Sequence, residues 1–208
     1  MKKLLTIIAT AFIALSVSAQ SEAGSFTLQP NVGFTYTTAT GDWGKGKDGA
    51  FALTAGVEGM YMVNDKFGAA LGVNLTGYNI SQEVVTSLKG DTEDWVYSNY
   101  YFNFPVTANY YVAPGLAVKA GIALNLLSTA KKDGYDEYEL VNPITNRVIA
   151  KTKVKDLYKS TFFSVPVGVS YEFNSFVFDA RYNIGISKVA KDDDGSFNAL
   201  TFTVGYKF

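Results

Sequence analysis

One stretch of the chain has the spacing of a nucleotide-binding loop. Residues 41–47 read GDWGKGK, which places glycine and lysine as in a phosphate-binding P-loop. The next residue is Asp48, where a P-loop carries Ser or Thr to contact a magnesium ion, and no helical pattern follows. The segment 192–195 (DDDG) offers oxygen ligands for calcium, but its spacing is not that of an EF-hand loop. We interpret both segments as solvated loops and expect no metal site and no cofactor.

The residue types that most often perform catalysis are missing. The chain has 208 residues and contains no Cys and no His. The first absence removes disulfides and thiolate nucleophiles, and the second removes the usual general base near neutral pH. A lipid hydrolase or acyltransferase would need a nucleophile beside a base, and no such pair can be assembled from this sequence. We therefore expect no catalytic residue and a protein that is not an enzyme.

Six charged residues lie well inside segments that have the pattern of a strand. All six fall on the face that carries Gly, Thr, Asn and Ser, and none falls on the face that carries Leu, Val, Ile and Phe. The six are Glu58, Lys119, Glu172, Asp179, Arg181 and Lys207. Three acids and three bases on one face can pair with one another, and we expect them to form a charge network in the interior of the fold.

The strands that carry these charges are predicted by apolar residues that recur with a period of two. The expected strands are 26–38, 50–63, 67–80, 96–112, 116–128, 161–173, 176–187 and 198–208. Three connections are tight turns, at 64–66, 113–115 and 174–175. Four are longer and polar, at 39–49, 81–95, 129–160 and 188–197. This alternation of short and long connections is typical of an all-β, eight-stranded antiparallel up-and-down transmembrane β-barrel of the outer-membrane type.

The first nineteen residues have the pattern of a secretion signal. Lys2 and Lys3 give a positive start, residues 4–15 are mostly apolar, and residues 17–19 (VSA) form a small-residue cleavage site. We expect residues 1–19 to be a cleaved signal peptide and residues 20–208 to form the outer-membrane β-barrel domain. Without Lys2 and Lys3, 16 basic residues stand against 19 acidic ones, which gives no reason to expect nucleic acid as a partner.

The orientation of the two faces follows from the cost of charge in lipid. A charge at mid-depth on a lipid-facing wall costs ~2–4 kcal/mol, so the charged face is expected to line the lumen and the apolar face to contact outer-membrane lipid. The lumen of an eight-stranded barrel is only just wide enough for its own side chains. Paired charges would make it a sealed core. Two alternatives stay open: a narrow or gated pore for small solutes, and a soluble lipocalin-like barrel that binds an apolar ligand.

Two parts of the chain resemble a known family. Residues 101–111 (YFNFPVTANYY), followed by GL at 115–116 and KAG at 119–121, look like the central hairpin of the PorT-like outer-membrane β-barrel domain family common in Bacteroidota. Residues 176–185 (FVFDARYNIG) and the closing VGYKF look like its last hairpin. The resemblance implies a barrel in the bacterial outer membrane. The final Phe208 resembles the signal by which the barrel assembly machinery recognises its substrates.

The longest loop, 129–160, carries most of its acids before its centre and most of its bases after it. The acids of the first arm are Asp133, Asp136, Glu137 and Glu139, and the second arm carries the bases Arg147, Lys151, Lys153 and Lys155. Folding about Ile144 would place the two arms side by side as paired strands. We expect a β-ribbon that continues past the membrane and offers a contact surface to an extracellular protein or glycan. This surface is where we expect function, if the barrel is more than structural.

Overall fold

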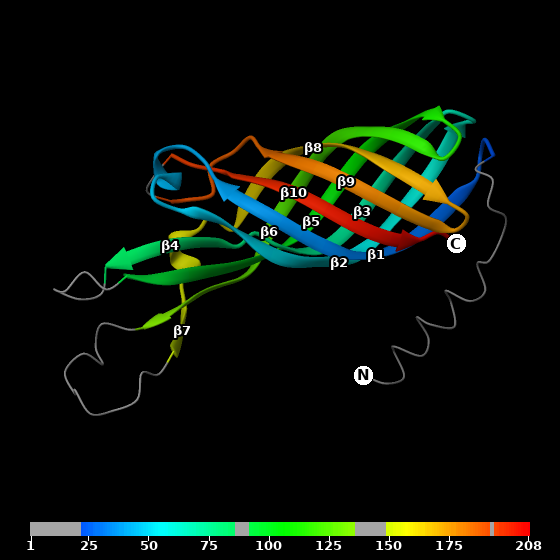
Figure 1. Cartoon of the computed structure of the whole chain (residues 1–208). Helices are drawn as coiled ribbons and strands as arrows, with labels where there is room; N and C mark the ends of the chain where they lie inside the picture. Colours follow the sequence, from blue (N-terminus) through cyan, green and yellow to red (C-terminus); the bar gives the residue numbers. More distant parts are fainter. Residues whose placement is uncertain (1–21, 86–91, 136–148, 192–193) are drawn as a thin grey trace.

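The wall of the molecule is one antiparallel sheet that closes on itself. The computed structural model describes residues 22–85, 92–135, 149–191 and 194–208 (Figure 1). Eight strands follow one another around the wall, and the last pairs with the first. They are β1 (Phe26–Ala39), β2 (Asp48–Asn64), β3 (Phe67–Gly77), β5 (Thr92–Ala113), β6 (Leu116–Tyr135), β8 (Thr161–Phe173), β9 (Phe176–Gly185) and β10 (Phe197–Tyr206). The predicted eight-stranded antiparallel barrel is confirmed.

The seam between β1 and β10 closes the ring of hydrogen bonds. Asn31 of β1 lies opposite Gly205 of β10. Past the end of β10, the backbone N–H of Phe208 donates to the carbonyl of Leu28 at 2.9 Å, and the N–H of Leu28 donates to the carbonyl of Phe208 at 3.2 Å. The pairing therefore extends beyond the bounds of the strand itself.

Tight turns join the strands at one end of the barrel. In the β2–β3 turn, the side-chain oxygen of Asn64 accepts hydrogen bonds from the backbone N–H groups of Lys66 and Phe67, both at 2.9 Å. The β5–β6 turn places Gly115 at φ 74°, and the β8–β9 turn places Asn174 at φ 54°. These left-handed conformations suit Gly and Asn better than other residues, which explains why these types occupy the turns.

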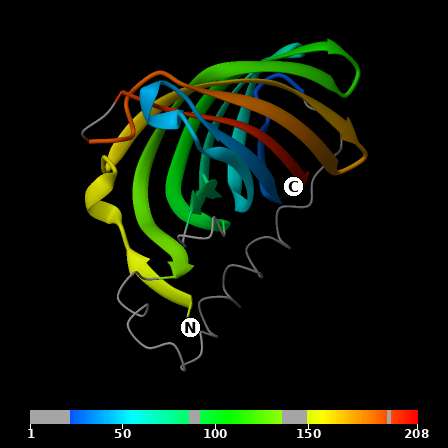
Figure 2. The same ribbon diagram turned by 60° about the vertical axis from the view of Figure 1, so that its left-hand side comes forward.

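The long connections at the other end contain two strands beyond the eight of the wall. β4 (Ile80–Val85), which was not predicted, pairs with the long-loop end of β5, and β7 (Ile149–Lys153), which belongs to the predicted ribbon, pairs with the long-loop end of β6 (Figure 1). The predicted strands 96–112 and 116–128 were too short. The reason is that strands beyond the membrane no longer separate a lipid face from an interior face, so the period of two fades. Figure 2 shows β6 and β7 projecting past the barrel wall.

Paired strands form in loop 129–160 where the structure describes it, as the ribbon predicted, but in another register. Folding about Ile144 would place Asp133 opposite Lys155, whereas Asp133 of β6 lies opposite Lys151 of β7, and Lys131 lies opposite Lys153. Ile144 and the charged residues from 136 to 147 lie outside the described residues. Two short 3-10 helices, η1 (Asp42–Gly44) and η3 (Lys155–Leu157), complete the long connections. In the described part of the chain, no helix is long and apolar enough to cross a membrane. The predicted signal peptide, 1–19, also falls outside that part.

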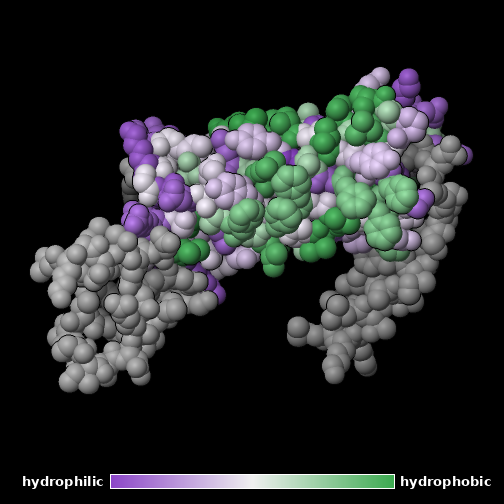
Figure 3. Space-filling view, viewed as in Figure 1, coloured by the Kyte–Doolittle hydropathy of each residue, from purple (hydrophilic) through white to green (hydrophobic). Residues whose placement is uncertain are grey.

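Burial alternates along each strand and puts the large apolar residues outside. Leu53, Leu71 and Val106 are 69%, 59% and 51% exposed, whereas neighbouring Thr and Asn side chains are buried. Figure 3 shows apolar surface over the middle of the wall and hydrophilic side chains at both ends. A soluble lipocalin-like barrel would show the opposite arrangement, with its charges outside and its large apolar side chains within. The wall is therefore built to contact lipid.

A lysine in the middle of this wall should be far more harmful than one at its edge. Val106 and Val112 both face outward from β5, but Val106 lies near mid-depth and Val112 lies at the tight-turn end. We expect Val106→Lys to lower the free energy of unfolding in lipid vesicles by ~2–4 kcal/mol and Val112→Lys by at most ~1 kcal/mol. Urea titration of both variants measures this difference, and equal losses would contradict a lipid-facing wall.

Candidate functional site

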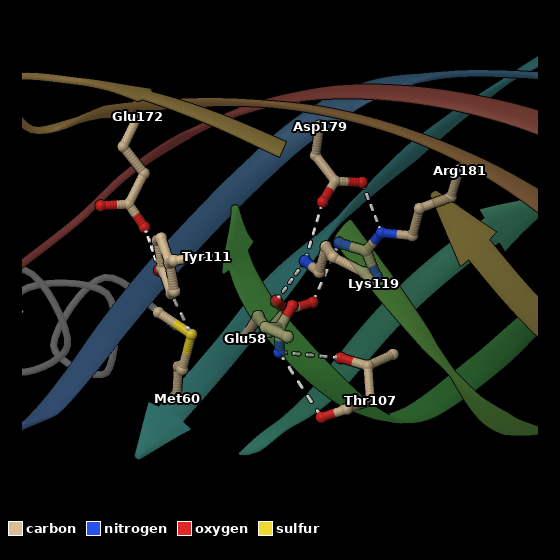
Figure 4. Close-up of polar contacts among 9 residues, drawn as sticks. Glu58, Met60, Thr107, Tyr111, Lys119, Glu172, Asp179 and Arg181 are labelled. Carbon is tan, nitrogen blue, oxygen red and sulfur yellow. Dashed lines mark hydrogen bonds and ion pairs between the residues drawn. The ribbon is translucent and has the colours of Figure 1, made fainter. Parts of the chain in front are cut away.

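Four of the six predicted interior charges form a closed ring of ion pairs across the lumen. Lys119 Nζ lies 2.8 Å from Glu58 Oε1 and 2.8 Å from Asp179 Oδ2. Arg181 contacts the same two carboxylates, with Nη2 2.9 Å from Glu58 Oε2 and Nε bonded to Asp179 Oδ1 (Figure 4). Each cation thus bridges both carboxylates, and each carboxylate binds both cations. We call these four residues the ion-pair ring.

The ion-pair ring joins strands that are not neighbours in the wall. Glu58 comes from β2, Lys119 from β6, and the other two from β9. Two strands separate β2 from β6, one separates β6 from β9, and two separate β9 from β2. All four residues are buried, with exposures of 7% or less. An uncompensated buried charge costs several kcal/mol, so the equal number of acids and bases is what allows them to remain ionised here.

The other two predicted charges form a separate pair nearer the tight-turn end. Lys207 contacts Glu172 in an ion pair. The hydroxyl of Tyr111 donates to the other oxygen of Glu172 at 2.5 Å and lies 3.7 Å from the sulfur of Met60. The six residues therefore occupy two levels of the lumen instead of one network. Tyr111 was not among the predicted residues, because nothing in its spacing distinguishes it from the other tyrosines of the strands.

A layer of amides and hydroxyls lies on the long-loop side of the ion-pair ring. Asn125 is its centre: its side-chain oxygen accepts from Asn103 at 2.7 Å and from the hydroxyl of Tyr78 at 3.1 Å, and its nitrogen donates to Ser164 at 3.1 Å. A cavity of about 20 Å³ remains between this layer and Arg181. A water molecule needs about 10–15 Å³ of such space, so the cavity has room for about one.

Aromatic side chains close the mouth of the barrel at the long-loop end. Three come from strands, and three come from the long connections. They are Tyr101, Phe162 and Phe197, with Trp43, Tyr78 and Tyr158. The ring centroids of Tyr101 and Phe162 are 5.0 Å apart, and those of Trp43 and Phe197 are 5.4 Å apart. We call these six residues the aromatic cap.

Backbone hydrogen bonds hold the long connections over the mouth. The N–H of Lys159 donates to the carbonyl of Val189 at 2.8 Å, and Tyr158 and Ala190 form a β-bridge. The N–H of Trp43 donates to the carbonyl of Asp194 at 3.1 Å. Burial raises the pKa of the Tyr158 hydroxyl, so this residue stays neutral in the cap. Sequence reasoning missed the cap because it treated these loops as polar. The sequence feature that could have indicated the cap is the presence of a few apolar residues within otherwise polar loop segments.

The two loops with ligand-like spacing are engaged in local contacts. Lys47, the lysine of the P-loop-like segment, donates to the carbonyl of Trp43 and lies 4.5 Å from the centre of the Trp43 ring. Asp194 forms an ion pair with Lys188, whereas residues 192–193 are not described. Among the described residues, no group of three acidic side chains is placed to hold a metal ion. The P-loop-like segment is followed by strand β2, so it lacks the strand–loop–helix arrangement of a phosphate site.

Removing one member of the ion-pair ring should cost more than removing a balanced pair. Arg181→Gln leaves Glu58 and Asp179 sharing one lysine, and we expect a loss of ~3–5 kcal/mol in unfolding free energy. The double variant Glu58→Gln/Arg181→Gln keeps the Lys119–Asp179 pair and restores neutrality, so it should be more stable than Arg181→Gln alone. Lys45→Gln, which breaks an exposed pair, serves as the control. Additive losses in a urea titration would contradict the ring.

The aromatic cap should hold the long connections in place. Phe197→Ala removes a buried ring, and we expect a loss of ~3–5 kcal/mol together with faster amide exchange in residues 154–160 and 187–191. Phe202→Ala is the matched control, because Phe202 lies on the lipid face of the same strand and acyl chains can fill the space it leaves. Hydrogen exchange measured by mass spectrometry tests this, and unchanged exchange in Phe197→Ala would refute it.

Comparison with known proteins places the chain in a family. Residues 7–208 match the family described as outer membrane protein beta-barrel domain. Ail of Yersinia pestis is 13% identical, with a TM-score of 0.51 over 89% of this chain and 99% of that one. Neisserial surface protein A is 17% identical, with a TM-score of 0.51 over 90% and 100%. Ail has also been solved with the heparin analogue sucrose octasulfate, at 12% identity and a TM-score of 0.50 over 88% of this chain and 99% of that one.

The sequence identities to these solved structures are low, so the likeness to Ail and to the Neisserial protein shows a common fold and nothing more. No curated protein sequence matches the chain. The family match covers nearly the whole length and agrees with the closed sheet and its apolar outer wall. The chain belongs to the outer membrane protein beta-barrel domain family, and it is a small β-barrel of the bacterial outer membrane.

Proposed function

We propose that the protein is a sealed, non-enzymatic outer-membrane barrel that binds an extracellular partner through its long connections. The observation that carries this proposal is the filling of the lumen. The tight-turn end is hollowed by about 930 Å³ of space that reaches Tyr111 and Glu172. From there to the mouth, the interior holds the Glu172–Lys207 pair, the ion-pair ring, the amide layer and the aromatic cap. Since the interior is packed as a core, it is the outer surface that is available for interaction.

The contacts of the ion-pair ring favour a seal over a pore. In a conducting pore, charged side chains line a water path and leave their other side to solvent. Here both carboxylates bind two cations each, and the residues are buried. The aromatic cap adds a second, apolar barrier at the mouth. A gated pore would have to break the ring and move the cap, which involves both the strands and the long connections.

The absence of an enzymatic role is supported by the same contacts. The carboxylates of Glu58 and Asp179, which are the most deeply placed acids, are occupied by ion pairs and are shielded from any substrate outside. The chain contains no Cys or His that would supply a nucleophile or a base near neutral pH. We therefore propose that neither the lumen nor the mouth performs chemistry, and that the wall serves to anchor the outer surface in lipid.

The surface that we propose for the partner is the sheet that continues past the wall. β4, β5, β6 and β7 extend beyond the mouth, and the adjoining η3 segment exposes Leu157 at 52% and Lys155 (Figure 1). Binding sites are often carried by connecting segments held by a rigid scaffold. An extracellular protein or a glycan would suit a surface that mixes exposed lysines with apolar side chains. The structure of Ail with a sulfated sugar supports the choice of an anionic glycan as the first probe.

Export and assembly are proposed on the sequence pattern. We propose that residues 1–19 are a signal peptide removed after export, and that the barrel assembly machinery reads the closing segment with Phe208. The position of Phe208 in the β1–β10 seam supports a role in closure. We also propose that the chain falls in the PorT-like branch of its family, found in Bacteroidota, on the likeness of residues 101–111 and 176–185.

A sealed lumen predicts the absence of stable conductance. The purified protein in planar bilayers should give no large, long-lived current steps, because the ion-pair ring and the aromatic cap both block the lumen. Arg181→Gln should reduce stability without opening a lasting channel, because the cap remains. Large, stable steps from the unaltered protein would overturn the sealed barrel and favour the pore.

Partner binding should depend on the exposed side chains of η3. The double variant Lys155→Glu/Leu157→Ser should weaken binding to host cells or to sulfated glycans, since both side chains are exposed on the proposed surface. A linker in place of residues 192–194 serves as the control for a general loop effect. Binding can be measured with whole bacteria on glycan arrays and cultured cells. Equal binding by all three proteins would argue against this surface.

A further inference from the structure

An apolar groove crosses the outer wall beside the β1–β10 seam. It runs over β1, β10, β9 and β8 and has a volume of about 390 Å³. Its centre is Ala180, whose cross-strand neighbours on the same face are large: Phe202 of β10 and Val169 of β8. Phe178 borders Ala180 along the same strand. The groove is therefore a gap left by one small side chain in a wall of large ones.

The groove points toward the tight-turn end of the barrel. On the tight-turn side of Ala180 it is bounded by Leu116, directly after the β5–β6 turn, and by Tyr171, which lies opposite Leu116 near the end of β8. Barrels of this kind place their short turns in the periplasm. The groove thus extends from the middle of the wall to the periplasmic edge of its apolar band, where Tyr171 is 49% exposed. Tyrosine is favoured at such an edge because its ring is apolar and its hydroxyl reaches water.

The walls of the groove are held by ring contacts. Phe34 of β1 and Phe202 of β10 have ring centroids 5.4 Å apart across the seam. The side chains that line an empty groove lack dispersion contacts on the side that faces the gap. A flexible acyl chain that enters the groove makes such contacts on several of its sides, whereas a chain lying on a flat wall makes them on one side. The same wall is already the interface with the bilayer, which means that the groove is continuous with a surface covered by acyl chains.

We propose that this groove binds one acyl chain of a phospholipid from the periplasmic leaflet, with the headgroup beside Tyr171. A lipid from this leaflet enters with its headgroup at the periplasmic edge and its chain directed toward Ala180, which matches the direction of the groove. The site requires only that the barrel lies in the outer membrane. It does not depend on the extracellular partner, so the two proposals can fail separately.

Filling the groove should displace the lipid. Ala180→Phe places a large ring in the gap, and Ala120→Phe is the matched control, because Ala120 also faces lipid, from β6, and does not line the groove. Proteins are exchanged into detergent after incubation with phosphatidylethanolamine and phosphatidylglycerol, and retained lipid is counted by native mass spectrometry. The unaltered protein and Ala120→Phe should each retain one phospholipid. Ala180→Phe should retain at least about tenfold less, the factor expected when about two methylene groups lose their burial.

Other outcomes would overturn the proposal. Equal retention by Ala180→Phe, or no retained lipid in the unaltered protein, would refute the site, and a dimer cross-linked through this wall would assign the groove to a second copy of the chain. If Ala180→Phe does not fold, a phospholipid with a diazirine in its acyl chain tests the unaltered barrel. Labelling should concentrate on peptides that contain residues 169–180, whereas even labelling around the wall would contradict a defined site.

Discussion

The structure depends first on the neutrality of four buried charges. Glu58, Lys119, Asp179 and Arg181 lie in a space too narrow for the water that would otherwise solvate them, so each must be compensated by the others. Compensation requires β2, β6 and β9 to stand at the correct height relative to one another. The ion-pair ring therefore restricts the register of the whole cylinder, in addition to filling its centre. The amide layer and the aromatic cap are arranged around this fixed level.

Lipid outside and polar groups inside reverse the usual distribution of a soluble protein, but the interior is still packed as a core. Its apolar part has moved to the mouth, where Phe162 and Phe197 meet side chains from the long connections. At the mouth the protein meets water, so burial of these apolar side chains stabilises the fold by the hydrophobic effect, as in soluble proteins. The barrel thus uses hydrogen bonds and ion pairs at the depth of the membrane and apolar packing outside it. Polar groups pair with one another in the lumen, where little water is available to solvate them, and apolar side chains pack together at the mouth, where contact with water would be unfavourable.

The sequence predicted the membrane-spanning strands, because each of them has lipid on one side and the lumen on the other. Strands within the membrane alternate because lipid lies on one side and the lumen on the other, and this pattern also assigned the faces of all six charged residues. It could not predict which charges meet, because Glu58 and Lys119 are 61 residues apart and are brought together by the closure of the sheet. Nor could it predict β4, or the placement of Trp43 and Tyr158. Their positions follow from contacts between connections that are distant in the chain, and such contacts leave no periodic signal.

The seam between β1 and β10 has a consequence for the order of events during biogenesis. Asn31 pairs with Gly205, so the hydrogen-bond ring remains open until β10 is in place beside β1. Until then, β1 and the strands that follow it form an open sheet with an unpaired edge. Contacts of such long sequence separation form slowly and leave unpaired strands prone to aggregation. The period before the seam closes is therefore the stage at which a barrel of this design is most prone to aggregation.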